Sequence, residues 1–157
     1  MSSLHFMSKL GLLAISATIV GGGWSGGRSS ATPSRPATPI TPAAAPGKVI
    51  DVQMLGDAGG YRFSPATITV KRGDRVRWIM ASGAPHNVVF WPDSIPAGAA
   101  AKLGKAMSKT MAPLTGPMLM SQNEKYEVSF AGLPVGTYRY YCTPHLALGM
   151  KAIVRVE

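Results

Sequence analysis

The chain of 157 residues is long enough for one domain with an appended segment and too short for two domains with separate cores. Hydrophobic residues make up 46% of it, which excludes an intrinsically disordered chain. It carries 16 Lys and Arg against 7 Asp and Glu, a net charge of +9 that favours acidic partners or an anionic surface. These basic residues are dispersed and are not interleaved with stacking aromatic side chains, so binding to nucleic acid is not expected.

The first 28 residues are predicted to be an export segment. Lys9 precedes an apolar stretch at residues 10–20, and a glycine-rich region follows as far as Arg28. The uncharged span between Lys9 and Arg28 has 18 residues, but its glycines make its last third a poor membrane helix. We therefore expect residues 1–28 to be a signal peptide, with an uncleaved N-terminal anchor as the alternative.

Residues 29–47 are predicted to be a linker. They combine five prolines with Ser, Thr and Ala, a composition that cannot bury much apolar surface. We expect an extended, polyproline-like segment, which would act as a membrane tether if the N-terminus is anchored. The folded domain then comprises residues 48–157.

The domain shows the alternation of apolar and other residues that is typical of strands with one buried face. This alternation covers residues 76–80, 126–130 and 152–156. Further strand candidates, bounded by Gly, Pro and Asp turn signals, are residues 49–55, 66–70, 87–91 and 137–142. Seven or eight short strands in about 110 residues predict an all-β protein with a β-sandwich architecture.

Residues 96–123 interrupt the strand pattern with Pro, Gly and four methionines. We interpret them as a long loop with one helical turn that covers one end of the sandwich. Because thioethers suit Cu(I), a second interpretation is that the methionines of residues 103–120, Met118 and Met120 above all, bind Cu(I).

The C-terminal part of the domain gathers metal-binding side chains. Cys142 is the only cysteine, so no intramolecular disulfide can form. Cys142, His145 and Met150 lie within nine residues. Strand periodicity places Cys142 on the inward face at the end of a strand, and Pro144 and Gly149 then shape a loop that can return His145 and Met150 to the same point.

His86 completes a set of four donors. It follows Pro85 at the start of another predicted strand. One thiolate, two imidazoles and one thioether match a blue-copper site, in which Cys and His bind strongly and an axial Met binds weakly. Zinc is disfavoured because structural zinc sites rarely use Met and usually contain closely spaced Cys or His pairs.

Several short motifs together resemble the plastocyanin branch of the cupredoxins, and the resemblance covers essentially all of residues 48–157. The motifs are Phe63-x-Pro65, Gly73-Asp74-x-Val76, Pro85-His86-Asn87-Val88-Val89-Phe90, Asp93-Ser94-Ile95-Pro96, Gly136-Thr137-Tyr138 and Cys142-x-x-His145-x4-Met150. Each motif alone is a weak signal, whereas their joint order and spacing are specific. The resemblance implies a Greek-key cupredoxin sandwich that binds one copper ion through His86, Cys142, His145 and Met150.

The resemblance also implies roles for residues around the ligands. Asn87 would brace the cysteine loop and keep the site stiff. One electron route would leave through the exposed edge of His145, and the other through Tyr141, which is covalently next to Cys142. The apolar patch expected around His145 comprises Ala84, Pro85, Leu146, Ala147 and Leu148.

Two features depart from the family pattern. Plant-type plastocyanins carry an acidic recognition patch, whereas the corresponding loop here has Lys102, Lys105 and Lys109 and no carboxylate between Ile95 and Asn123. Tyr61 stands where the family usually has a small apolar residue. We therefore expect a partner with an acidic docking face.

The function expected from the sequence is one-electron transfer, with Cu(I)/Cu(II) cycling between extracytoplasmic redox partners such as cytochromes or a membrane complex. The chain is expected to be a monomeric, exported or periplasmic protein and not an enzyme, because the four donors leave no open position for a substrate. The alternative is a periplasmic copper chaperone or copper-storage protein, which the methionine-rich loop mildly favours.

Overall fold

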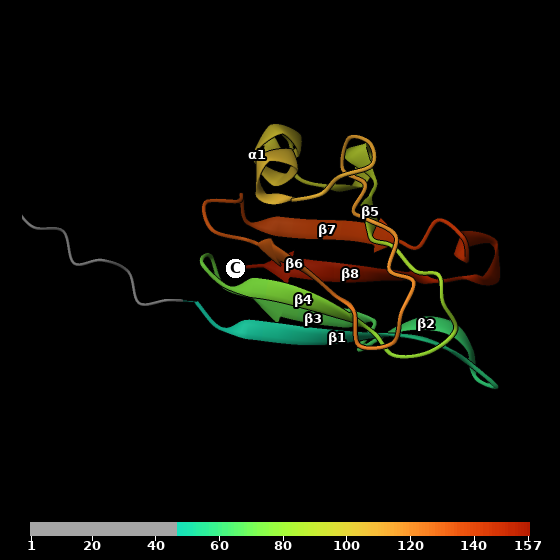
Figure 1. Ribbon diagram of the computed structural model, residues 1–157. Coiled ribbons are helices and arrows are strands. Elements are labelled where there is room, and N and C mark those ends of the chain that lie inside the picture. Colours follow the sequence, from blue (N-terminus) through green and yellow to red (C-terminus); the bar gives the residue numbers. More distant parts are fainter. Residues whose placement is uncertain (1–46) are drawn as a thin grey trace, which may run out of the picture. The chain divides into compact units, whose positions relative to one another are not determined.

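The computed structural model describes residues 47–157 (Figure 1). The predicted signal peptide or anchor at residues 1–28 and all but the last residue of the predicted linker at 29–47 lie outside the described residues. The strands are β1 (Val49–Asp57), β2 (Gly60–Ser64), β3 (Thr67–Val70), β4 (Arg75–Met80), β5 (Val89–Phe90), β6 (Lys125–Ser129), β7 (Gly136–Tyr141) and β8 (Lys151–Val156). The helical elements are α1 (Ala99–Ala106) and the 3-10 turns η1 (Pro92–Ser94) and η2 (Leu146–Leu148).

None of the helical elements in this part of the chain is long and apolar enough to cross a membrane.

The strands form two four-stranded sheets, which confirms the predicted β-sandwich (Figure 1). One sheet has the order β2-β1-β4-β6 and the other has the order β3-β8-β7-β5. The pairs β1–β4 and β3–β8 are parallel, and the other pairs are antiparallel. Because β4 and β5 belong to different sheets, the segment between them, which contains His86, crosses from one layer to the other.

Aromatic side chains fill the space between the sheets. Trp78 of β4 and Tyr140 of β7 are fully buried and meet edge to face, with ring centroids 5.4 Å apart. Phe63 of β2 meets Tyr140 at 4.7 Å. Such pairs add about 1 kcal/mol beyond the apolar area that they bury. The inner face of β7 is therefore tightly packed as far as Tyr140, two residues before Cys142.

Two predicted strands differ from the structure. The strand predicted at 49–55 extends to Asp57. The chain then turns back into β2, a strand that the sequence patterns do not predict. The strand predicted at 87–91 is reduced to Val89–Phe90. Before β5 the chain bonds to the long loop instead of to a strand. The backbone N–H of Gly116 donates to the carbonyl of Val88 at 2.8 Å, and His86 and Leu119 exchange two backbone hydrogen bonds of 3.0 and 2.7 Å.

The segment at residues 96–123 contains more regular structure than the single helical turn predicted for it. The helix α1 has eight residues and buries Ala99 and Leu103 against the core. Beyond it, Met107 is buried and Thr115 forms a bridge with Val89. The segment therefore lies against the sandwich and supports the strand that follows His86.

Asp74 joins the start of β1 to the turn before β4. Its carboxylate accepts hydrogen bonds from the backbone N–H groups of Lys71 and Lys48, each at 2.8 Å. The bond from Lys71, followed by that from Lys48, lowers the pKa of Asp74 below its ordinary value. Only 9% of its surface is exposed. The charged carboxylate is therefore bound more favourably in the folded chain than in the unfolded chain.

Replacing Asp74 with Asn should lower the free energy of unfolding by about 1 to 2 kcal/mol at neutral pH, because one of the two N–H donors would face an amide NH₂ group. A lowered carboxyl pKa stabilises the fold above the unfolded pKa, and this contribution is lost as the pH falls through the folded pKa. Urea unfolding of copper-free protein should therefore show a difference at pH 7 that shrinks as the pH falls below the ordinary Asp pKa of about 4. A difference that stays constant with pH would contradict this role.

Candidate metal centre

Three side chains converge at one end of the sandwich. The Sγ atom of Cys142 lies 3.6 Å from Nδ1 of His86 and 3.5 Å from Nδ1 of His145. The three potential ligand atoms lie within 4.8 Å of one another, and all three residues are buried. A sulfur and a nitrogen bound at about 2.3 and 2.0 Å in a trigonal arrangement would be about 3.7 Å apart. The spacing therefore fits a single metal ion bound by all three side chains.

A backbone carbonyl sets the orientation and tautomer of His86. Its Nε2 atom lies 2.8 Å from the carbonyl oxygen of Ser82. A carbonyl can only accept a hydrogen bond, so Nε2 carries the proton and Nδ1 keeps its lone pair toward Cys142. Burial lowers the pKa of His86. The imidazole is thus held neutral with its free nitrogen directed into the cluster, as a metal ligand must be.

The thiol of Cys142 is fully buried at the end of β7. Burial raises the pKa of Cys142, and hydrogen bonds from the backbone N–H groups of Asn87 and His145 offset only part of this rise. A thiolate in this place needs a nearby positive charge to be stable. A bound cation would supply it, so the chemistry of the cluster also fits a metal site.

His145 is covered by an aromatic ring. Only 7% of its surface is exposed, and Tyr61 of β2 stacks on its imidazole with ring centroids 3.7 Å apart and planes 10° apart. Space for the Tyr61 ring exists because Gly56 lies opposite on β1, where an added Cβ would be 2.5 Å from the ring. Burial, together with the proximity of His86, lowers the pKa of His145. The exposed edge expected for His145 is therefore small.

The position of Tyr61 reveals a contact that the sequence patterns missed. From the sequence, Tyr61 is only a departure from the family pattern, because the strand patterns do not predict β2. The signal that could have found β2 is the Gly59-Gly60 pair after β1, which favours a hairpin turn, followed by alternation of Tyr61 and Phe63.

Asn87 connects the two segments that carry the ligands. Its Oδ1 atom accepts a hydrogen bond from the backbone N–H of Thr143 at 2.7 Å, and its Nδ2 donates to the Thr143 hydroxyl at 3.2 Å. Asn87 is 2% exposed and lies 56 residues from Thr143 in the sequence. These bonds fasten the residue after Cys142 to the residue after His86, a geometry suited to the predicted bracing role.

Met150 is fully buried and belongs to the same compact loop. The backbone N–H of Cys142 donates to the carbonyl of Met150 at 3.1 Å, and the N–H of Met150 donates to the carbonyl of His145 at 3.1 Å. Gly149 adopts φ +86°, a left-handed conformation that favours glycine and reverses the chain before Met150. The loop therefore holds the backbone of Met150 beside Cys142 and His145.

A profile described as "Copper binding proteins, plastocyanin/azurin family" matches residues 50–157. The chain belongs to this family. Plastocyanin from Scenedesmus fuscus is 35% identical over 108 residues, covering 69% of this chain and 99% of that protein. Plastocyanin A/B from Petroselinum crispum is 38% identical over 107 residues, covering 68% and 99%.

Solved structures agree with this membership in the plastocyanin/azurin family. The oxidised plastocyanin of the fern Dryopteris crassirhizoma superposes with a TM-score of 0.52 at 30% identity, covering 69% of this chain and all of that chain. Plastocyanins bind copper and are electron carriers, not enzymes. The predicted fold, cofactor and class of function are therefore confirmed, and His86, Cys142 and His145 are positioned for metal binding.

Replacing Cys142 with Ser should abolish the intense visible absorption of the copper-loaded protein, because that band arises from charge transfer between thiolate and Cu(II). Visible spectra and metal analysis of the same samples would separate loss of colour from loss of copper. Met120→Ser is the matched control, since it removes an exposed sulfur elsewhere in the chain. An intense band retained by Cys142→Ser would rule out the cysteine as the copper ligand.

Proposed function

We propose that this chain is a one-electron carrier between extracytoplasmic redox partners and that His86, Cys142, His145 and Met150 hold its copper ion. The observation that carries the proposal is the convergence of one sulfur and two imidazole nitrogens in a single buried cluster. Bound copper supplies the Cu(I)/Cu(II) couple. The four side chains provide no open position for a substrate, which suits electron transfer rather than catalysis.

The surrounding residues keep the ligands in one arrangement in both oxidation states. Ser82 orients His86, Asn87 fastens the cysteine loop, and Tyr61 packs on His145. Because these contacts do not depend on the charge of the bound ion, little rearrangement accompanies the gain or loss of an electron. A site with little rearrangement exchanges electrons quickly, as a carrier requires.

We assign the predicted electron-transfer surface to the loops around His145 and to the outer face of β7. Leu146 and Leu148 are 38% and 62% exposed, and Pro85 is partly exposed beside His86. These residues form an apolar patch suited to brief docking. Tyr141 lies on the outward face of β7, directly after the buried Tyr140 and before Cys142.

The compartment and the membrane tether are also part of this proposal. Relatives include plastocyanins whose names describe them as chloroplastic, and the sequence predicts an export segment at residues 1–28 and a linker at 29–47. We propose an exported, monomeric carrier in a periplasmic or other extracytoplasmic space, with the linker as a tether where the N-terminus remains anchored.

The alternative function is copper storage or delivery. The observation that favours it is the exposure of two thioethers in the long loop, Met111 at 63% and Met120 at 62%. Thioethers bind Cu(I), so this loop could receive copper in addition to the buried site. Met107 does not take part, because its side chain is packed in the core.

Metal stoichiometry and a redox titration together distinguish these functions. We expect tight binding of one copper ion per chain and a reversible one-electron titration followed by the visible band. The control is a Met111→Ala, Met118→Ala, Met120→Ala variant, which should behave identically. Uptake of further Cu(I) that this variant loses, with release to an acceptor chelator, would favour storage or delivery instead.

Met150 should tune the potential of the bound copper without deciding whether copper binds, because an axial thioether is a weak ligand. Met150→Leu should raise the potential by removing donation to Cu(II), and Met150→Gln should lower it. Met107→Leu, which replaces another buried methionine, is the matched control and should leave the potential unchanged. If Met150→Leu and Met150→Gln both kept the wild-type potential, as Met107→Leu should, Met150 would not be an axial ligand.

A further inference from the structure

The two sheets of the sandwich carry their charges differently on their outer faces. On the β2-β1-β4-β6 sheet, arginines are paired with carboxylates. The ion pairs are Arg62–Asp57, Arg75–Glu127 and Arg77–Asp51, with N–O distances of 2.6, 2.6 and 2.8 Å. Each pair joins neighbouring strands or a hairpin, so much of the charge on this face is neutralised locally.

The outer face of the β3-β8-β7 strands has no such neutralisation. Its outward positions are Thr67 and Thr69 of β3, Thr137, Arg139 and Tyr141 of β7, and Lys151, Ile153 and Arg155 of β8. Three of these residues are cations and none is a carboxylate. Within residues 47–157, Arg139, Lys151 and Arg155 form no ion pair. This face therefore presents uncompensated positive charge to solvent.

An aromatic pair borders this basic face. Trp91 follows β5, and its backbone N–H donates to the carbonyl of Arg139 on β7 at 3.2 Å. Its indole packs on the ring of Tyr141 with centroids 4.5 Å apart and planes 31° apart. Because Tyr141 is covalently attached to Cys142, the aromatic pair extends from the metal centre to the edge of the basic face.

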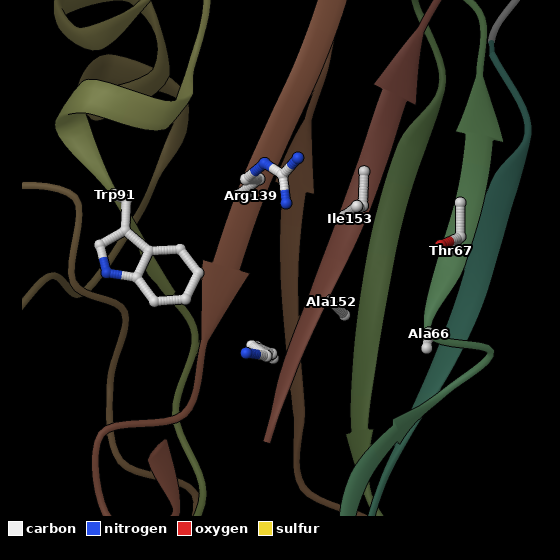
Figure 2. Close-up of a pocket in the computed structure, with 7 residues that line it drawn as sticks. Ala66, Thr67, Trp91, Arg139, Ala152 and Ile153 are labelled. Atoms are coloured by element: carbon white, nitrogen blue, oxygen red, sulfur yellow. The ribbon is translucent and has the colours of Figure 1, made fainter. Parts of the chain in front are cut away.

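A groove of about 240 Å³ lies between Trp91 and the strands. Figure 2 shows the Trp91 indole at one side, Thr67 at the other, and Arg139 and Ile153 between them. Lys151 also lines the groove, whereas Asp93, the carboxylate nearest to Trp91 in the sequence, does not. The groove thus combines an aromatic wall, an apolar floor and two cations.

We propose that this groove, together with the basic outer face of β7 and β8, is a docking surface for the acidic face of a redox partner protein. A carboxylate-bearing side chain of the partner would bind between Arg139 and Lys151, and its apolar part would pack on Trp91. This inference rests on the proposed carrier function and locates its acidic partner on β7 and β8 rather than on the lysines of α1.

The same contact gives the partner a short path for the electron. One electron would leave the reduced metal centre through Cys142, Tyr141 and Trp91 and reduce the oxidised partner, with no bond formed and no proton moved. Opposite charges on the two surfaces would speed the encounter, and the small groove would let the partner leave again.

The test combines a binding map with electron-transfer rates. A hexaglutamate peptide, added to isotope-labelled protein in low salt, should shift the Trp91 indole N–H resonance and amide resonances of β7 and β8. The double variant Arg139→Glu, Lys151→Glu should weaken peptide binding and slow electron transfer to an acidic c-type cytochrome, each by about tenfold or more. Lys102→Glu, Lys105→Glu changes the net charge equally and should have less than a twofold effect.

The aromatic contribution is tested separately. With the acidic cytochrome at saturating concentration, Trp91→Leu should lower the limiting rate, and Trp91→Phe should restore most of it. Rates in the wild-type protein should fall as salt rises, because the Debye length shortens from about 30 Å at 0.01 M to about 10 Å at 0.1 M.

Three results would overturn the docking proposal: peptide shifts confined to α1 or to the His145 loop, equal effects of the two charge reversals, or a limiting rate unchanged in Trp91→Leu. The visible spectrum and the reduction potential of the copper-loaded protein, measured for every variant, report on the carrier function independently of docking. If the double reversal fails to fold, Arg139→Gln, Lys151→Gln serves in its place, with the same expected direction.

Discussion

The sulfur of Cys142 lies where two segments 56 residues apart are fastened together, and the other features of the site depend on this junction. The bonds between Asn87 and Thr143 hold the cysteine loop against the segment that carries His86. Burial opposes a free thiolate at this position, while the neutral imidazoles of His86 and His145 present nitrogens 3.6 and 3.5 Å from the sulfur. The fold thus creates a place that is unfavourable for an isolated charged thiolate and favourable for one bound to a cation.

The same junction explains how a buried site communicates with the surface. The aromatic packing of Tyr140 anchors the inner side of β7, which leaves Tyr141 on the outer side next to the ligand. At the loop end, Tyr61 covers His145 and restricts its contact with solvent. Two different surfaces therefore lie close to the site. One is small and apolar and lies near His145, and the other is basic and aromatic and lies along β7. The charge of the partner would decide which surface it binds.

Much of this arrangement could be predicted from the sequence, because the ligands and their spacing are local properties. The run from Cys142 to Met150 and the turn before His86 specify which donors are present, and period-two alternation identifies most strands. β2 gives too weak a pattern to predict, because it is short and buries only Phe63 among its five residues. The stack of Tyr61 on His145 depends on β2 and cannot be predicted without it. The contrast between paired and unpaired cations on the two sheets depends on strand pairing across the fold, which composition cannot reveal. The sequence therefore identifies the lysines of the long loop but not the basic outer face of β7 and β8.

We propose that the fold holds one set of copper ligands in both oxidation states. X-ray absorption spectroscopy at the copper edge, on oxidised and reduced protein at neutral pH, tests it most directly. We expect one short sulfur donor and two nitrogen donors in both states, with no change in their number on reduction. Loss of a nitrogen donor on reduction, or a sulfur donor that is absent in either state, would contradict it.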